Sequence, residues 1–407
     1  MSACLAAVVL ACSGMASAHG GARVQPGAGT RDAAHAHPEP RGDSHGHAAS
    51  SSAAPTTNDL LVLGTRALVE HRFAEALAHG SAALADAGAG ANEAHALAVV
   101  TDACVELGRY DDAVGYAQRL VDRYPGLAAH ARVSYLRELH GDAAGARNAM
   151  RDAAGAGRDG DEVAWCRVRV AELELLLGDL GAAEREANLA LALAPRCAEA
   201  VALLGRVRAA RGEWPEAIAR YRTALEMRAD SGFFIALGEA LEASGDTPGA
   251  LDAFESARSV LEEDAAAGTD VELELIALDL DLLDKPERST AGEDDVHVGI
   301  TRAEGHLVER ALALRDRRPT IFADALLAEV LARAGRIDEA IAAVERCLRL
   351  RCGNPVLLYR AAIARRVAGD SAGTAPLLRA ALAAAPALGA RHAAAASRLL
   401  AEIAETP

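Results

Sequence analysis

The residues with the clearest capacity for chemistry are four histidines arranged as two His-x-His pairs. His35, His37, His45 and His47 lie in residues 19–57, a stretch dominated by Gly, Pro, Ser, Ala and His. Imidazole is the commonest metal ligand, and short His-rich tracts bind Zn, Ni or Cu weakly. No carboxylate or cysteine is placed to complete a rigid tetrahedral site. We interpret the stretch either as a metal-capturing tail or as a soluble tether whose histidines only titrate.

The rest of the chain offers no recognisable set of catalytic residues. No nucleophile stands with a matching base, and the GxxxxGK[ST], HExxH and CxxC motifs do not occur. Histidines beyond residue 57 are scattered singly, which is typical of surface or packed residues. The five cysteines beyond residue 57 fall mostly on expected helix faces and are expected to be small, free, buried residues. We therefore expect a protein that is not an enzyme and has no cofactor.

Charge and composition restrict the fold and the partners. The net charge is −16, which disfavours nucleic acid because no segregated basic stripe is present. Hydrophobic residues make up 51% of the 407 residues, but aromatic residues make up only 3%. Most of the apolar content is Ala and Leu, the strongest helix formers, and no long alternating run suggests a strand. The composition predicts an all-α protein with closely packed helices.

A short phrase recurs along the chain: Gly, a charged residue, three further positions, then Ala. It starts at Gly108, Gly141, Gly178, Gly212, Gly245 and Gly335, with a weaker copy at Gly369. From Gly108 to Gly245 the glycines are 33, 37, 34 and 33 residues apart. A period near 34 residues indicates stacked supersecondary units rather than one globular core.

One unit shows the pattern of side chains in full. It contains Leu204, Gly205, Gly212, Trp214, Ala217, Tyr221 and Ala224. This arrangement resembles the tetratricopeptide repeat family, in which a Gly-x-aromatic turn joins two helices and small residues allow them to approach. The resemblance implies an α-solenoid, a right-handed superhelix of antiparallel helix pairs. It covers residues 58–388 with about nine repeats, and residues 389–407 resemble a C-terminal capping helix.

The register of the repeats breaks between about residues 262 and 320. Helices are expected at 270–284 and 302–316, and an acidic insert at 285–300 replaces the tight turn between them. From residue 262 to residue 295 there are 13 acidic residues against Lys285 and Arg288. Three interpretations remain open: a solvated charged loop, a docking patch for a basic partner, or a loose cation site.

The N-terminus has features of an export signal. Residues 3–18 are apolar and end in Ala16-Ser17-Ala18, an A-x-A cleavage pattern. Val9 to Cys12 also resembles a lipobox, so lipidation of Cys12 is an alternative and would provide the only expected membrane contact. No Lys or Arg precedes the apolar core, which leaves a disordered cytosolic leader as a third interpretation. Residues 1–18 are thus assigned to a signal and residues 19–57 to a disordered tether.

The resemblance also implies a binding site. Proteins of this family hold a partner segment in the concave groove lined by the first helix of each repeat. The matching positions here are Asp102, Tyr135, Glu172, Arg206, Glu239 and Glu329. One subfamily clamps a C-terminal carboxylate with Lys and Asn, which are absent from these positions, so that role is not transferred. The acidic bias predicts a basic or amphipathic protein segment as the partner.

The sequence therefore predicts a non-enzymatic interaction scaffold that acts outside the cytoplasm. Two alternatives are a metal-handling accessory protein that uses the His-rich tail, and a cytosolic regulator of the same family.

Overall fold

The computed structural model describes residues 54–86, 88, 90–283 and 293–405, with side chains described outside 293–304. These residues form helices and no strand. The first helices in chain order are α2 (Thr57–Val69), α3 (Phe73–Asp86), α4 (Ala91–Glu106), α5 (Tyr110–Arg123), α6 (Leu127–Leu139), α7 (Ala143–Gly155), α8 (Gly160–Leu176), α9 (Leu180–Leu193), α10 (Ala198–Ala210) and α11 (Trp214–Met227). They are followed by α12 (Ser231–Ser244), α13 (Thr247–Ala266), α14 (Glu272–Leu283), α15 (Glu293–Arg317), α16 (Ile321–Arg333), α17 (Ile337–Leu348), α18 (Pro355–Val367), α19 (Ser371–Ala383), α20 (Ala385–Leu388) and α21 (Ala390–Glu405).

Consecutive helices pack as hairpins. In the described part of the chain, α2 pairs with α3, α4 with α5, and so on to α18 with α19, which makes nine hairpins. We call them units one to nine. Each unit also packs on the next, so the core is a series of clusters along the stack rather than one centre. The prediction of an all-α solenoid of helix pairs is confirmed.

The charged residue of the repeated phrase caps the following helix in four of the seven copies. Asp179 and Asp246 precede the second helix of their units, and each carboxylate accepts a hydrogen bond from the main-chain N–H three residues later. Such an N-cap satisfies a donor that the first helical turn leaves free. Arg109 and Glu213 occupy the same position without a side-chain cap. The repeated phrase therefore marks the turn between the two helices of a unit. In the copies that contain Asp, the N-cap also stabilises the start of the second helix.

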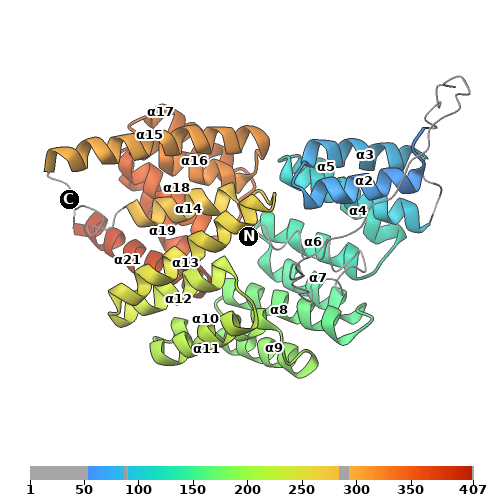
Figure 1. Ribbon diagram of the computed structural model, residues 1–407, viewed down its shortest axis with the longest axis horizontal. Coiled ribbons are helices and arrows are strands. Elements are labelled where there is room, and N and C mark those ends of the chain that lie inside the picture. Colours follow the sequence, from blue (N-terminus) through green and yellow to red (C-terminus); the bar gives the residue numbers. More distant parts are fainter. Residues whose placement is uncertain (1–53, 87, 89, 284–292, 406–407) are drawn as a thin grey trace, which may run out of the picture.

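The chain follows an arc that brings distant units together. Figure 1 shows this arc running from α2–α5 on one side, through α8–α11, to α15–α17 on the other. Unit two meets the end of unit seven, where the Arg318 guanidinium pairs with the Glu106 carboxylate at 2.6 Å and both are buried. The main-chain N–H of Ile321 donates a hydrogen bond of 3.0 Å to the Tyr110 hydroxyl. One hydrophobic cluster is shared by helices α4–α6 and α14–α18.

The acidic insert differs from its prediction. We expected a loop over 285–300 followed by a helix from residue 302, but α15 already begins at Glu293. The physical reason lies in the residues that open it, since Glu293, Asp294 and Asp295 are acidic and negative charge favours the first turn of a helix. The second half of the predicted loop is thus helical.

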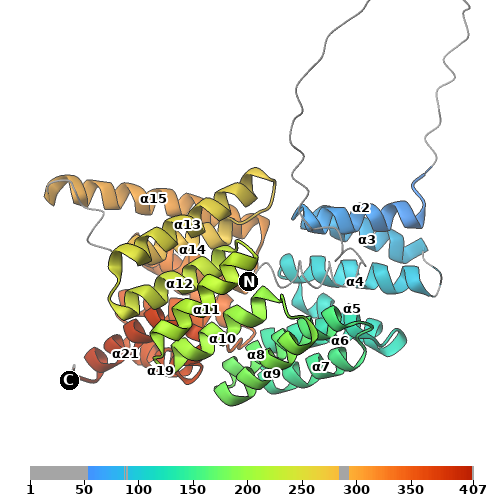
Figure 2. The ribbon, with the colours of Figure 1, turned by 60° about the horizontal axis from the view of Figure 1, so that its bottom comes forward.

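The C-terminal segment does more than cover the last unit. Helix α21 packs against α19, as a capping helix does, but it also contacts α12 and α18. The short helix α20 contacts α8 and α10. Figure 2 shows α21 between α19 and α12 at one edge of the molecule, in agreement with its contacts to both helices. The C-terminal helices therefore lie against the inner face of units four to six.

Candidate partner groove

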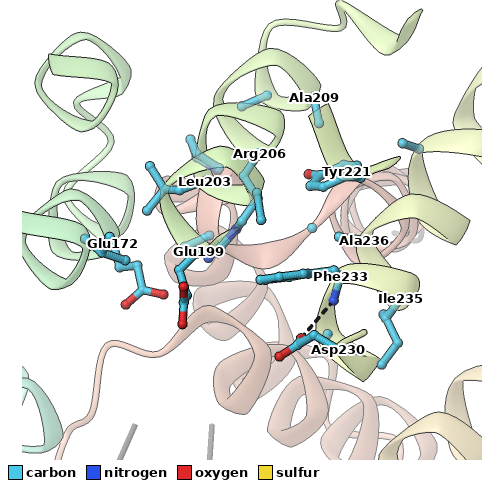
Figure 3. Close-up of a pocket in the computed structure, with 18 of the residues that line it drawn as sticks. Glu172, Glu199, Leu203, Arg206, Ala209, Tyr221, Asp230, Phe233, Ile235 and Ala236 are labelled. Atoms are coloured by element: carbon cyan, nitrogen blue, oxygen red, sulfur yellow. Dashed lines mark hydrogen bonds between the residues drawn. The ribbon is translucent and has the colours of Figure 1, made fainter. Parts of the chain in front are cut away.

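A cavity of about 1700 Å³ lies on the inner face of units four to six. Its walls come from the first helices of these units, α8, α10 and α12, and from residues 385–394 of the C-terminal segment. Figure 3 shows side chains of these helices directed into the cavity. Three of the six predicted groove residues, Glu172, Arg206 and Glu239, line it.

The repeat pattern positions the cavity wall through close helix contacts. A Cβ at Gly205 would lie 2.7 Å from the ring of Tyr221, so this glycine lets the ring rest on the α10 backbone. Unit six repeats the contact, since a Cβ at Gly238 would lie 2.8 Å from the ring of Phe254. The residue after each glycine therefore points to the inner face, which places Arg206 and Glu239 in the cavity.

Three polar groups in the cavity have no hydrogen bond or ion pair to the described residues: the Arg206 guanidinium, the Tyr221 hydroxyl and the Glu239 carboxyl. Tyr221 is only 2% exposed. Burial raises the pKa of its hydroxyl above the usual value. Burial also raises the pKa of the Glu239 carboxyl, although the charges of His392 and Arg206 oppose the shift. These groups belong to α10, α11 and α12 and face one space.

Other charges in the cavity neutralise one another. The Arg169 guanidinium pairs with the Glu172 carboxylate on the same helix. Arg228 pairs with Glu199 at 2.5 Å, and its guanidinium lies 5.3 Å from the ring centre of Phe233. In total, five carboxylates and five arginines line the cavity. The groove is therefore charge-balanced, which does not support the expected acidic bias.

Most of the apolar wall was not foreseen. Trp165, Trp214 and Phe233 line the cavity together with Pro386 and Leu388. The two tryptophans stand out because aromatic residues are rare in this chain, but their positions in the sequence favour a packing role. The residues at 385–388 carry no signal at all, because only a long-range contact brings α20 to the groove.

The remaining three predicted groove residues do not line this cavity. Asp102 is 2% exposed, and its carboxylate pairs with the Arg132 guanidinium at 2.5 Å. Glu329 is also 2% exposed and pairs with Arg360 at 2.7 Å. In both cases the first helix of the next unit supplies the arginine. Tyr135 is partly buried against a hydrophobic cluster that includes α4–α6 and α14–α18. The assignment of these three residues to a partner groove stays a prediction.

The sequence of unit five matches a known repeat. The model of the tetratricopeptide repeat matches residues 200–233, which cover most of α10, α11 and the start of α12. The chain therefore contains a tetratricopeptide repeat at unit five. The turn glycine Gly212 and the packed ring of Tyr221 lie inside the matched stretch, so the features that shape the cavity are those of the repeat itself.

The chain is similar to several solved structures. It shares 20% identity with MamA over 41% of this chain and 97% of that chain, with a TM-score of 0.33. It shares 16% identity with a chain of the APC/C hetero-tetramer Cut9-Hcn1, over 86% of this chain and 56% of that chain, with a TM-score of 0.36. A tetratricopeptide repeat protein from Parabacteroides merdae shares 10% identity, over 76% of this chain and 98% of that chain, with a TM-score of 0.40. No curated protein matches the sequence.

A buried charge network holds the C-terminal helix α21 in place. Asp281 of α14 accepts from His392 Nε2 at 3.3 Å and from Arg360 at 3.0 Å. Burial alone would lower the pKa of His392, but the hydrogen bond and charge of Asp281 outweigh it and raise the pKa. Burial would raise the pKa of Asp281, but Arg360 and His392 hold it well below its usual range.

The acidic segment near unit seven is largely neutralised within the fold. Arg310 pairs with both Glu272 and Asp279 at 2.6 Å, and Arg258 pairs with Asp279 at 2.5 Å. These carboxylates already have cationic partners. The described part of the segment therefore has the character of an internal ion-pair network rather than an open acidic patch.

The predicted metal ligands His35, His37, His45 and His47 and the predicted lipidation site Cys12 lie outside the described residues. Among the described residues, no group of three or more His, Cys, Asp or Glu side chains is placed to hold a metal ion. Cys104, Cys166, Cys197, Cys347 and Cys352 are free thiols. None of the helices in the described ranges has both the length and the apolar character needed to span a bilayer.

Proposed function

We propose that this protein is a non-enzymatic scaffold that binds a segment of a partner protein in the cavity of units four to six. The observation that supports this is the cavity itself, built by the first helices of three consecutive units, of which unit five matches the tetratricopeptide repeat. Its volume of about 1700 Å³ exceeds the usual range for a small-molecule pocket, which is about 300 to 1000 Å³. A helix about 10 Å wide and about 20 Å long has a similar volume.

The lining favours an amphipathic partner segment over a uniformly basic one. Aromatic and aliphatic side chains form most of the wall, and the lining charges balance. A segment with one apolar face would bury that face against Trp165, Leu203 and Phe233. Its polar face would remain at the open side, beside the ion pair of Arg228 and Glu199.

Site-specific cross-linking tests the proposal. A photoreactive benzoylphenylalanine replaces Phe233 in the cavity, and the matched control carries it at Ala219, which is exposed on α11 outside the cavity. We expect the Phe233 position to give one defined adduct with a partner segment, identified by mass spectrometry. Equal adduct formation at the two positions, or none at Phe233, would contradict binding in the cavity.

We also propose that binding takes place outside the cytoplasm. The support is the apolar stretch of residues 3–18 with its Ala16-Ser17-Ala18 pattern. A fusion of residues 1–57 to alkaline phosphatase, which is active only after export, is expected to be active in cells. Activity equal to that of a fusion lacking residues 1–18 would contradict export.

A further inference from the structure

Two equivalent rings in neighbouring units differ by one hydroxyl group. Tyr221 in unit five packs on Gly205, and Phe254 in unit six packs on Gly238, 33 residues further on in each case. Both residues are almost fully buried, at 2% and 3% exposure. Phe254 shows that the packing contact needs only the ring. The hydroxyl of Tyr221 is therefore not required for stacking of the units.

The Tyr221 hydroxyl faces the cavity. Tyr221 lines the cavity, and Figure 3 shows its hydroxyl end directed toward Arg206. Within the described chain, neither this hydroxyl nor the Arg206 guanidinium makes a hydrogen bond. Arg206 is only half-buried, and both groups border the cavity, so each is free to bind a polar group that enters it.

Glu239 completes the polar group from the next unit. It stands one repeat after Arg206, and its Oε2 lies so close to Gly389 that a Cβ there would approach it to 2.6 Å. The backbone of Gly389 thus confines the carboxyl group to the cavity side. Arg206, Tyr221 and Glu239 then present a donor, a hydroxyl and an acceptor within a wall formed by Leu203, Phe233 and Leu388.

The combination selects among ligand groups. A lysine or arginine side chain would leave Arg206 without an acceptor, and a carboxylate would leave Glu239 without a donor. An apolar side chain would leave all three polar groups without partners. A carboxamide has a carbonyl oxygen that accepts from Arg206 and Tyr221, and an NH2 group that donates to Glu239.

We propose that Arg206, Tyr221 and Glu239 form a subsite that binds the side-chain carboxamide of a glutamine or asparagine on the apolar face of the partner segment. This proposal rests on the proposed function, because it specifies what the segment in the cavity carries. It makes the groove selective for one polar residue within an otherwise apolar surface.

A peptide selection tests binding in the cavity and the carboxamide subsite separately. A phage-displayed library of 13-residue amphipathic helical peptides, randomised on the apolar face, is selected on the full chain. A parallel selection uses the full chain with Ala236→Trp, which places a bulky ring in the cavity beside Phe233. We expect peptides enriched only on the unmodified chain, with Gln or Asn at one apolar-face position.

Each other outcome has a defined meaning. Enriched peptides with only apolar residues, or with a charged residue at that position, would overturn the subsite and leave binding in the cavity intact. Equal enrichment on both chains would contradict the cavity as the binding site and, with it, the subsite.

Direct affinity measurements then assign the hydroxyl. One selected peptide and its Gln→Met version are titrated by calorimetry against the unmodified chain, Tyr221→Phe and the control Tyr116→Phe, whose ring lies on α5 away from the cavity. We expect the Met peptide to bind about tenfold more weakly to the unmodified chain and to Tyr116→Phe. For Tyr221→Phe we expect the difference to fall to about threefold or less. An unchanged preference in Tyr221→Phe would overturn the proposed role of the hydroxyl.

Discussion

Units four and six and units two and eight carry acidic residues at the same position of the repeat, with opposite outcomes. Glu172 and Glu239 line a cavity, whereas Asp102 and Glu329 are each 2% exposed and bound to arginines. The repeat position determines that a residue points to the inner face. What the residue meets there depends on where its unit lies in the arc.

The neighbouring first helix makes the difference, because Arg132 of unit three binds Asp102 and Arg360 of unit nine binds Glu329. Units two and three also share a hydrophobic cluster with units seven to nine. Buried charged side chains such as Asp102 and Glu329 must be paired, because removing a charge from water without a partner costs free energy. Units four to six face only the C-terminal helices, and there the inner face keeps a cavity and unpaired groups such as Arg206.

The largest expected effect is a difference in the free energy of unfolding between one alanine variant in each region. Asp102→Ala leaves the buried Arg132 guanidinium without its carboxylate, and we expect a loss of about 3–5 kcal/mol in the free energy of unfolding. Glu172→Ala removes a partly exposed partner of Arg169, and we expect a loss below about 1 kcal/mol. Urea denaturation followed by circular dichroism measures both. Equal losses would refute the distinction between the closed and open inner faces.

A pair of turn glycines tests closure of the arc itself. Gly108 has φ of 64°, and a Cβ there would lie 2.3 Å from the carbonyl oxygen of Pro319. Gly212 has φ of 74°, and nothing lies within 4 Å of its Cβ position. Both alanine variants suffer left-handed strain of about 1–2 kcal/mol. Gly108→Ala also forces unit two away from Pro319, for a total loss of about 2–4 kcal/mol.

Small-angle X-ray scattering distinguishes strain from opening. We expect the radius of gyration to rise for Gly108→Ala and to stay unchanged for Gly212→Ala, because only the first position contacts a distant unit. A radius of gyration that is the same for both variants would show that this contact does not hold the arc closed.

The hairpins were predictable because their signals are local. The spacing of Gly212 and Gly245 and the capping Asp246 lie within one repeat, so periodicity and turn chemistry reveal them. Closure joins Glu106 to Arg318, 212 residues later in the chain, and no short pattern encodes that contact. The same reason explains why Phe233 and the C-terminal wall of the cavity were missed, while Arg206 was found from its place after Gly205.

Stability should depend on pH through the C-terminal helix. The pKa of His392 is raised in the folded protein, so its stabilising contribution is complete below the unfolded value near 6.5 and is lost as pH rises through the folded pKa. The charges that face it are Asp281 on α14, Arg360 on α18 and Glu239 on α12. We expect the free energy of unfolding to fall from pH 6 to pH 8.5, and His392→Gln to flatten that slope. An unchanged slope in His392→Gln would contradict the assignment.

The smallest expected effect is the sharpest test of the open inner face. Burial raises the pKa of Glu239 in the folded protein. Ionisation of this group therefore lowers the free energy of unfolding as the pH rises from the usual glutamate pKa through the folded pKa. Glu239→Gln removes that ionisation, and we expect stability at pH 7 to be unchanged or higher by less than about 1 kcal/mol. Glu329→Gln stands at the matching position in unit eight and removes the charge bound by Arg360, so we expect it to be destabilising. The same denaturation experiment measures the change in the free energy of unfolding for both variants. Changes of opposite sign are expected only if the inner face is open at unit six and closed at unit eight.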